Sequence, residues 1–196
     1  QLLCNPVLAK TWSRIIRESE AVSGSRENQI DQARKTFYQG FVAEAMERFC
    51  LNEEVLDNSG RKHKGVLNGQ DLAGWEATYE ASLTYHYTGL EIGKCGPWSQ
   101  GPVQLQTLAL LKEMGVADWN PVSTDFVHGV TEALKLAFAD REAYYGDPDF
   151  VKVPLKQLLS REYNQERSRE ISDRASLRLR PGKISGFEVR MPEFDS

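Results

Sequence analysis

Apolar residues recur at helical spacing between Thr124 and Tyr145. The apolar positions of this stripe are Val127, Val130, Leu134, Ala137 and Phe138. Steps of three and four residues place such side chains on one face of a helix, so we expect this face to pack against a core. A start signal lies at residues 123–125, and Gly146 with Pro148 gives a stop signal. A helix over this segment is the clearest element in the chain.

Two more apolar stripes predict helices before residue 50. The first begins at Asn5-Pro6, where an N-cap precedes a proline of the first turn, and ends at Ser23-Gly24. The second runs from Ile30 to Phe49 with Gly40 inside it, which predicts either two short helices or one interrupted helix. Polar residues 51–70 then predict an exposed connection.

A change of period from Tyr79 onward predicts a β-hairpin. Apolar and polar residues alternate up to Tyr87, a period of two that a strand satisfies and a helix does not. Thr88-Gly89 is a two-residue turn into residues 90–94. We therefore place a hairpin at about residues 77–95.

The loop Cys95–Pro102, CGPWSQGP, has the most unusual local composition in the chain. It joins the hairpin to a helix that has Pro102 near its first turn and Gly115 beyond its end. Loops in this position can carry sites, but neither GxxxxGK[ST] nor GxGxxG is present, so a phosphate site is not predicted. The alternative is a rigid turn that only presents the helix. The candidate residues beside a site are Trp98, Ser99, Gln100 and Gly101.

The C-terminal third is more polar. A charged helix begins at Ser160 and is expected on the surface, and residues 174–196, which show no periodicity, are expected to form an extended, mobile tail. Asp140 and Arg141 suggest catalysis at first sight. Adjacent helical residues point about 100° apart, so ion pairs with other neighbours are the better interpretation.

Composition indicates a folded protein with one ordinary core. The chain has 196 residues, 40% hydrophobic and 27% charged residues, and a formal net charge of −4. Lys and Arg are interspersed with Asp and Glu, so no basic surface for nucleic acid or anionic lipid is expected. No apolar run approaches the roughly 18 to 20 residues of a membrane span, so no membrane partner is expected either.

Neither a metal site nor a disulfide framework is predicted. The cysteines are Cys4, Cys50 and Cys95, and the histidines are His63, His86 and His128. The cysteines are odd in number and far apart, and the histidines match neither HxxxH nor HExxH spacing. We expect no cofactor in this chain.

Several segments, in order, resemble the gamma-glutamyltransferase family. They are ARKTFYQGFVAEAM (33–46), GVLNGQDLAGW (65–75), YTGL (87–90), GPWSQG (96–101), EALKLAFADREAYYGDPDFVKVPL (132–155) and LRPGK (179–183). The order of the segments makes the resemblance more specific than any one of them. His63-Lys64-Gly65 departs from the family's usual double glycine, and GPWSQG departs from its PPSSGG motif.

The resemblance implies an α+β chain that forms part of an αββα N-terminal-nucleophile hydrolase sandwich. This portion would be the mostly helical second half of the large subunit, with residues 1–173 as a helical region with the hairpin and residues 174–196 leading to a self-cleavage point at or just after Ser196. The nucleophile would be the N-terminal threonine of a small partner subunit, so no catalytic residue is expected in this chain. The substrate would be a small gamma-glutamyl or amide compound.

The resemblance leaves alternatives open. Trp98 and Gln100 replace small hydroxyl residues of the family motif, so a relative that hydrolyses another small amide, of the oxamate or acylase type, is the second interpretation. A non-catalytic helical interaction module is the third. The few cysteines slightly favour a reducing, cytoplasmic compartment, while the family also includes periplasmic and surface enzymes.

Overall fold

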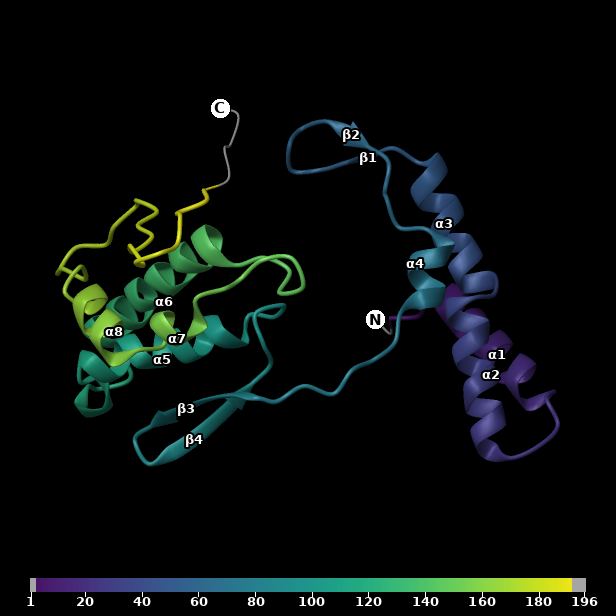
Figure 1. Ribbon diagram of the computed structural model, residues 1–196, viewed down its shortest axis with the longest axis horizontal. Helices are drawn as coiled ribbons and strands as arrows, with labels where there is room; N and C mark the ends of the chain where they lie inside the picture. Colours follow the sequence, from purple (N-terminus) through teal and green to yellow (C-terminus); the bar gives the residue numbers. More distant parts are fainter. Residues whose placement is uncertain (1–2, 192–196) are drawn as a thin grey trace. The chain divides into compact units, whose positions relative to one another are not determined.

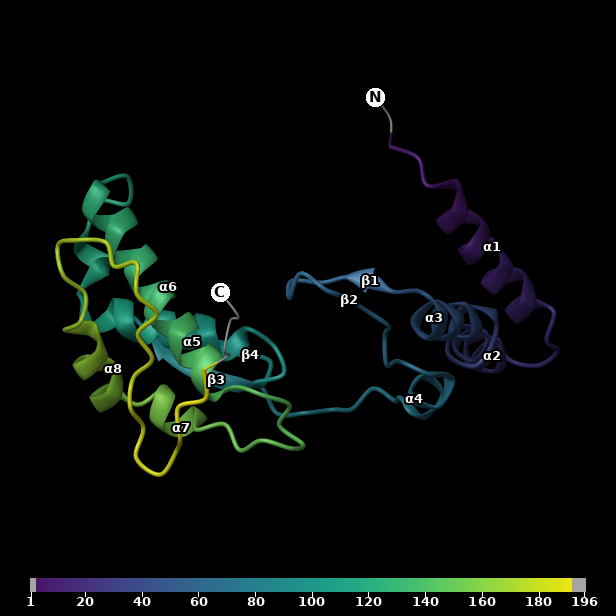
Figure 2. The ribbon, with the colours of Figure 1, turned by 90° about the horizontal axis from the view of Figure 1, so that it is seen from above.

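The computed structural model describes residues 3–191 and divides into two compact units (Figures 1 and 2). The first unit extends to Thr78, and the second begins at Tyr79. The helices are α1 (Pro6–Glu20), α2 (Arg26–Tyr38), α3 (Phe41–Asn52), α4 (Gly69–Gly74), α5 (Gly101–Glu113), α6 (Thr124–Tyr144), α7 (Leu155–Leu158) and α8 (Arg161–Ser168), with a 3-10 turn η1 (Val116–Asp118). The strands are β1 (Val55–Leu56), β2 (Lys62–His63), β3 (Leu83–Tyr87) and β4 (Leu90–Lys94). The predicted α+β class, mostly helical with a hairpin, is confirmed.

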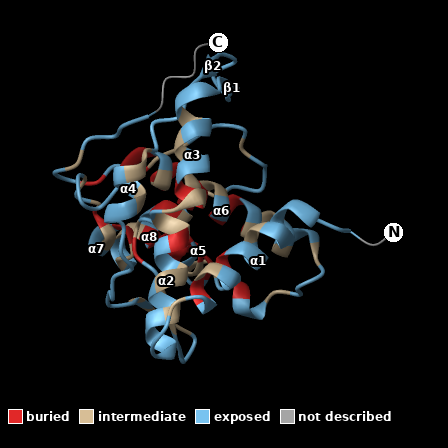
Figure 3. Cartoon of the chain, turned by 90° about the vertical axis from the view of Figure 1, so that its right-hand side faces the viewer, coloured by how far each residue is buried: buried red, intermediate tan, exposed pale blue. Residues whose placement is uncertain are grey.

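The first unit is built from short, locally capped helices. The side chain of Asn5 accepts a hydrogen bond from Leu8 N at 3.0 Å and begins α1, as predicted. The stripe from Ile30 to Phe49 forms two helices, and Gly40 is the N-cap of the second. Much of this unit is exposed (Figure 3), because its buried apolar side chains are few.

Residues 51–70 are largely exposed, as predicted, but they also contain a small hairpin that the sequence pattern did not reveal. β1 and β2 pair antiparallel, with Val55 opposite His63. The Asp57 carboxylate lies 2.6 Å from the Nδ1 atom of His63 across this hairpin. Two-residue strands are too short to show a period of two, which explains why the pattern did not predict them.

The second unit begins with the predicted β3–β4 hairpin. Tyr85 lies opposite Ile92, and the turn is Thr88-Gly89, whose φ angles of 45° and 85° suit a tight hairpin turn. β3 starts at Leu83 rather than at Tyr79, so the paired part is shorter than the alternating sequence.

The core of the second unit lies between α5 and α6. Its buried apolar residues are Val103, Leu110, Leu111, Val116, Ala133, Leu136 and Ala137. The predicted core stripe of α6 is partly wrong: Ala137 is buried, but Val127 and Leu134 are 59% and 38% exposed. The buried face of α6 is instead rich in alanine and includes the charged residues Glu132 and Asp140. A pattern of apolar residues cannot reveal a face that buries carboxylates.

The C-terminal residues require two corrections. α8 is not a simple surface helix, because Asn164 and Arg167 are 1% and 2% exposed. Residues 174–191 contain no helix or strand, yet they are not a free, mobile tail. Ile184 belongs to a second apolar cluster with Tyr144 and Leu158, and hydrogen bonds fix the segment to α6 and α8. Over residues 3–191, no helix has the length and apolar character needed to cross a bilayer.

Candidate functional site

The loop between β4 and α5 is closed by its own serine. Ser99 Oγ donates a hydrogen bond to the carbonyl oxygen of Gly96 at 2.9 Å and accepts one from Gly101 N at 3.0 Å. The amide of Ser99 also donates to Gly96 O at 3.1 Å. Because both partners of the hydroxyl are main-chain groups and no base contacts it within the described residues, Ser99 shapes the loop rather than acting as a nucleophile.

Gly101 allows the loop to turn back on itself at the start of α5. A methyl group at this position would lie 2.5 Å from the carbonyl oxygen of Cys95 and 2.8 Å from Cβ of Lys94. Such distances are well below van der Waals contact, so only glycine fits without a shift of the backbone. Gly101 is therefore a requirement of the loop geometry and supplies no chemistry of its own.

Trp98 and Gln100 are exposed side chains of the loop, as is Cys95. The indole Nε1 of Trp98 donates to Glu80 Oε1 at 2.5 Å, while 60% of the residue remains exposed. Gln100 occupies the N-cap position of α5 without a capping hydrogen bond from its side chain. A planar ring held at one edge and an exposed amide are suited to contact a ligand or a neighbouring protein surface.

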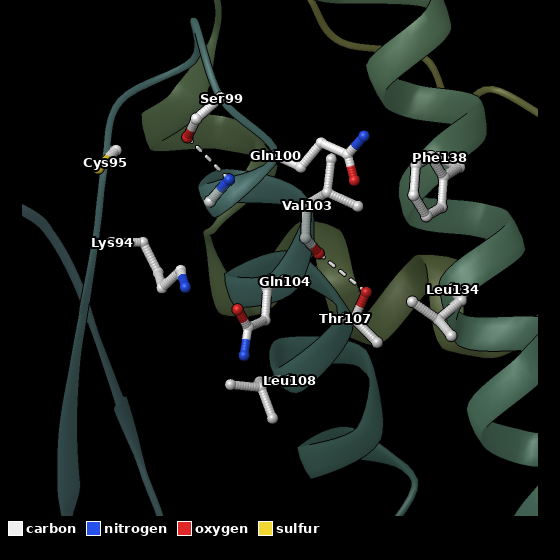
Figure 4. A pocket seen from close by; sticks show the side chains of 11 residues that line it. Lys94, Cys95, Ser99, Gln100, Val103, Gln104, Thr107, Leu108, Leu134 and Phe138 are labelled. Atoms are coloured by element: carbon white, nitrogen blue, oxygen red, sulfur yellow. Dashed lines mark hydrogen bonds between the residues drawn. The ribbon is translucent and has the colours of Figure 1, made fainter. Parts of the chain in front are cut away.

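A pocket of about 530 Å³ lies beside this loop (Figure 4). Its walls come from the end of β4, the loop, one face of α5 and two side chains of α6. The lining residues are Lys94, Cys95, Ser99, Gln100, Gly101, Val103, Gln104, Thr107, Leu108, Leu134 and Phe138. The volume is that of a small-molecule site, and the walls are mostly apolar with a few polar groups.

Three of the four predicted residues, Ser99, Gln100 and Gly101, line this pocket together, while Trp98 lies outside the lining and is held by Glu80. Sequence analysis missed Lys94 and Phe138. Lys94 has a signal that can be recognised, since it directly precedes the loop; Phe138 comes from a helix that follows more than twenty residues later, so no local signal exists.

The other residues that suggested catalysis form structural ion pairs. Asp140 is fully buried and pairs with Arg167, with Asp140 Oδ1 3.2 Å from Arg167 Nη2, while Arg141 pairs with the neighbouring Glu142. The interpretation of separate ion pairs is confirmed. Over residues 3–191, no group of three or more His, Cys, Asp or Glu side chains is placed to hold a metal ion. Ser196, the predicted processing boundary, lies outside the described residues.

A protein-family model for gamma-glutamyltranspeptidase matches residues 1–191. The glutathione hydrolase proenzyme of Escherichia coli is 31% identical over 156 residues, which are 78% of this chain and 25% of that protein. The acylase ACY 1 proenzyme of a Pseudomonas species is 38% identical over 104 residues, 53% of this chain and 19% of that protein. The chain therefore spans about a quarter of the length of the relatives it matches.

Solved structures give the same result. LmbA2991HD superimposes with a TM-score of 0.77 and 47% identity, over 98% of this chain and 32% of that one. The gamma-glutamyltranspeptidase of Helicobacter pylori superimposes with a TM-score of 0.65 and 26% identity, over 93% of this chain and 46% of that one. Sequence and fold thus point to the same group of proteins.

Proposed function

Because the chain belongs to the gamma-glutamyltranspeptidase family, we propose that it is part of the large subunit of a self-cleaving enzyme, which transfers or hydrolyses a gamma-glutamyl or related acyl group. The observation that carries this proposal is the family match over residues 1–191, nearly the whole chain. Relatives named as proenzymes support processing of a longer precursor.

In the proposed reaction, the nucleophile is a threonine that lies outside this chain. In the precursor, the hydroxyl oxygen of a threonine attacks the carbonyl carbon before it, the C–N bond breaks, and the hydroxyl proton ends on the departing nitrogen. Water then hydrolyses the resulting ester and leaves a threonine with a free amino group, which serves as the base for its own hydroxyl. The mature enzyme forms an acyl-threonine and passes the acyl group to water or to an amine. We place the cut at or just after Ser196 and expect a small partner subunit to begin there.

Within this scheme, the contribution of the chain is a rigid helical layer and the loop beside the pocket. Trp98, Ser99, Gln100 and Gly101 are the residues that we propose to lie beside the substrate. Their geometry supports a positioning role, since the Ser99 hydroxyl closes the loop and leaves Trp98 and Gln100 exposed. No group in the loop has the contacts of a nucleophile or a base among the described residues.

Intact mass and N-terminal sequencing of the full-length gene product test this function. After purification and incubation, we expect two fragments, the smaller of which begins with threonine. Gamma-glutamyl anilides should then be turned over by the cleaved protein. A single uncleaved species without activity would instead favour a non-catalytic interaction module.

Hydrolysis of another small amide is the second candidate function. The observation in its favour is the 38% identity to an acylase proenzyme over a stretch of 104 residues, together with the exposed indole of Trp98, which differs from the small hydroxyl residue expected there. The discriminating experiment compares kcat/KM for gamma-glutamyl anilides with that for oxamate-type and acyl amides. Preference for the second group by a cleaved protein would support the amidohydrolase over an enzyme specific for gamma-glutamyl donors.

A further inference from the structure

The segment 176–190 follows α6 in the same direction, although it has no regular structure of its own (Figures 1 and 2). Its first contact is with Glu132, near the middle of the helix, and its last is with Ala143 at the end, where Arg190 N donates to the carbonyl oxygen at 3.1 Å. The segment is therefore fixed along about half the length of α6. Each fixed point is a hydrogen bond to a buried or half-buried group.

Asp140 is the central point of attachment. Its Oδ1 accepts hydrogen bonds from Gly182 N at 2.7 Å and from Arg167 Nη2 at 3.2 Å. Its Oδ2 accepts from Gln106 Nε2 at 2.6 Å and from the Tyr163 hydroxyl at 2.8 Å. The carboxylate is fully buried, and four donors satisfy it, one from α5, two from α8 and one from the C-terminal segment.

Glu132 is the second point of attachment. Its Oε2 accepts a hydrogen bond from Arg180 Nη2 at 2.8 Å, and its Oε1 accepts from Lys135 and from Ser176 N, the latter at 3.2 Å. Burial is the largest single influence and opposes ionisation, but these hydrogen bonds and the charges of Lys135 and Arg180 together lower the pKa of Glu132. Arg180 also donates to the carbonyl oxygen of Glu170 at 2.7 Å, so it joins α6 to the end of α8.

Tyr144 completes the attachment. Its hydroxyl donates to Gly182 O at 2.6 Å and accepts from Ile184 N at 3.2 Å. Gly182 has room for no side chain, because a methyl group there would lie 2.2 Å from the hydroxyl oxygen of Tyr163. The main chain of residues 182–184 is thus held on both sides.

Stability alone does not account for two buried carboxylates on one helix. The free energy needed to remove two charges from water is about as large as the free energy gained from their attraction, so a protein with an apolar pair of similar volume is commonly just as stable. Charged hydrogen bonds have the additional effect of fixing direction and register, because each donor has one place in the network. The network therefore fixes where the segment lies.

We propose that Glu132 and Asp140 are positioning residues for self-cleavage, which hold residues 176–190 so that the chain that follows reaches the cleavage point in one place. This inference rests on the proposed function. Arg190, the last point of attachment, lies six residues before Ser196 in the sequence, so little chain separates it from the proposed cut. Without the attachments the free length would begin near residue 174, and the peptide to be cut would explore a far larger volume.

The test uses the full-length precursor and the variant Arg180→Ala. The rate of appearance of the small fragment should fall by about ten- to a hundredfold, since misplacement of reacting groups by about 1 Å costs on that order. Arg178→Ala is the matched control, because the Arg178 guanidinium forms no hydrogen bond or ion pair in the described part of the chain, and it should cleave at the original rate. Arg180→Lys, which can still reach Glu132 but cannot contact both partners as a fork, should cleave at an intermediate rate.

Two further measurements separate positioning from folding. The folded fraction of the Arg180→Ala precursor is measured at the temperature of the cleavage assay, well below its thermal midpoint, because removing one partner of the buried Glu132 lowers that midpoint. The kcat/KM of the molecules that have cleaved should stay close to the unsubstituted value, because the attachment matters before the cut. The proposal is overturned if Arg180→Ala cleaves as fast as Arg178→Ala, or if its slower cleavage only follows a smaller folded fraction. If Arg180→Ala does not fold, Arg180→Lys and Asp140→Asn decide by the same criteria. An unsubstituted precursor that never cleaves refutes the proposed function itself, and this inference with it.

Discussion

Replacing Gly182 by alanine should weaken the attachment of the C-terminal segment strongly. The new methyl group would lie 2.2 Å from the Tyr163 hydroxyl oxygen and 2.7 Å from Arg167 Cδ. To reach even 3.0 Å, the hydroxyl must move by about 0.8 Å. That shift is not free, because Tyr163 donates to the buried Asp140 at 2.8 Å.

The magnitude follows from two contributions. Overpacking of a tight interior costs about 1–3 kcal/mol, and loss of a hydrogen bond to a charged group costs about 1.5–3 kcal/mol. We therefore expect Gly182→Ala to lower the local opening free energy by roughly 3–5 kcal/mol. Amides of α8 and of residues 180–184 should exchange with solvent faster by roughly two to three and a half orders of magnitude, which hydrogen-exchange mass spectrometry measures directly.

A matched substitution and a double variant test the reasoning. Gly93→Ala is the control, since its nearest neighbour is Ser82 at an ordinary 3.6 Å, and it should leave exchange in α8 unchanged. In a Tyr163→Phe background, the clashing hydroxyl is gone, so Gly182→Ala should cost at least about 1 kcal/mol less than it does alone. Equal costs in the two backgrounds, or unchanged exchange in Gly182→Ala, would refute the account of this contact.

Three other outcomes are expected. Leu136→Ala removes a side chain that is 1% exposed, so it should lower the free energy of unfolding in urea by about 2–5 kcal/mol. Leu134 is 38% exposed, so Leu134→Ala should lower it by less than about 1 kcal/mol. Equal losses in the two variants would contradict the observed buried face of α6. Hydrogen bonds within the β1–β2 hairpin, of which that from the Ser59 hydroxyl is the largest influence, lower the pKa of Asp57 to about 2. The hydrogen bonds that the Asp57 carboxylate accepts should therefore persist above pH 4 and be lost as the pH falls toward 2. NMR titration of the carboxyl should show that midpoint, with a higher one in Ser59→Ala. Gly101→Ala should raise KM of the cleaved enzyme severalfold by displacing the loop, because its methyl group would lie 2.5 Å from a backbone carbonyl oxygen; an unchanged KM would separate the loop from substrate binding.

Local signals in the sequence were sufficient for most elements. Asn5 and Ser123 cap helices where they were expected to, Gly40 separates two helices, and Thr88-Gly89 forms the hairpin turn. Each of these features depends on residues within four positions of one another. Such interactions are fixed by chain geometry, and neighbouring residue types reveal them.

The predictions were wrong where contacts between residues distant in the sequence determine which side chains are buried. Glu132 and Asp140 are buried in α6 because their partners come from positions up to 48 residues later, among them Arg180 and Gly182. A polar residue on a helix is assigned to the solvent side unless its partner is known. That assumption left Glu132 and Asp140 out of the predicted core face of α6, and it left the C-terminal segment without predicted contacts. The same limit applies to the candidate site, where composition identified the loop but gave no indication of Phe138 on the opposite wall.

The contacts that α6 and α8 make with the attached segment go mostly to its main-chain atoms, which are Ser176 N, Arg180 O, Gly182 N, Gly182 O, Ile184 N and Arg190 N. Main-chain groups are the same whatever side chain a residue carries. The segment is thus free to diverge in sequence at positions such as Lys183 and Ser185 while keeping its path. Arg180, Gly182 and the buried Ile184 are constrained by their own chemistry or size. A library randomised over residues 177–190 should therefore recover folded variants of very different composition that keep Arg180, Gly182, an apolar residue at position 184 and glycine at position 186, where φ is 80°.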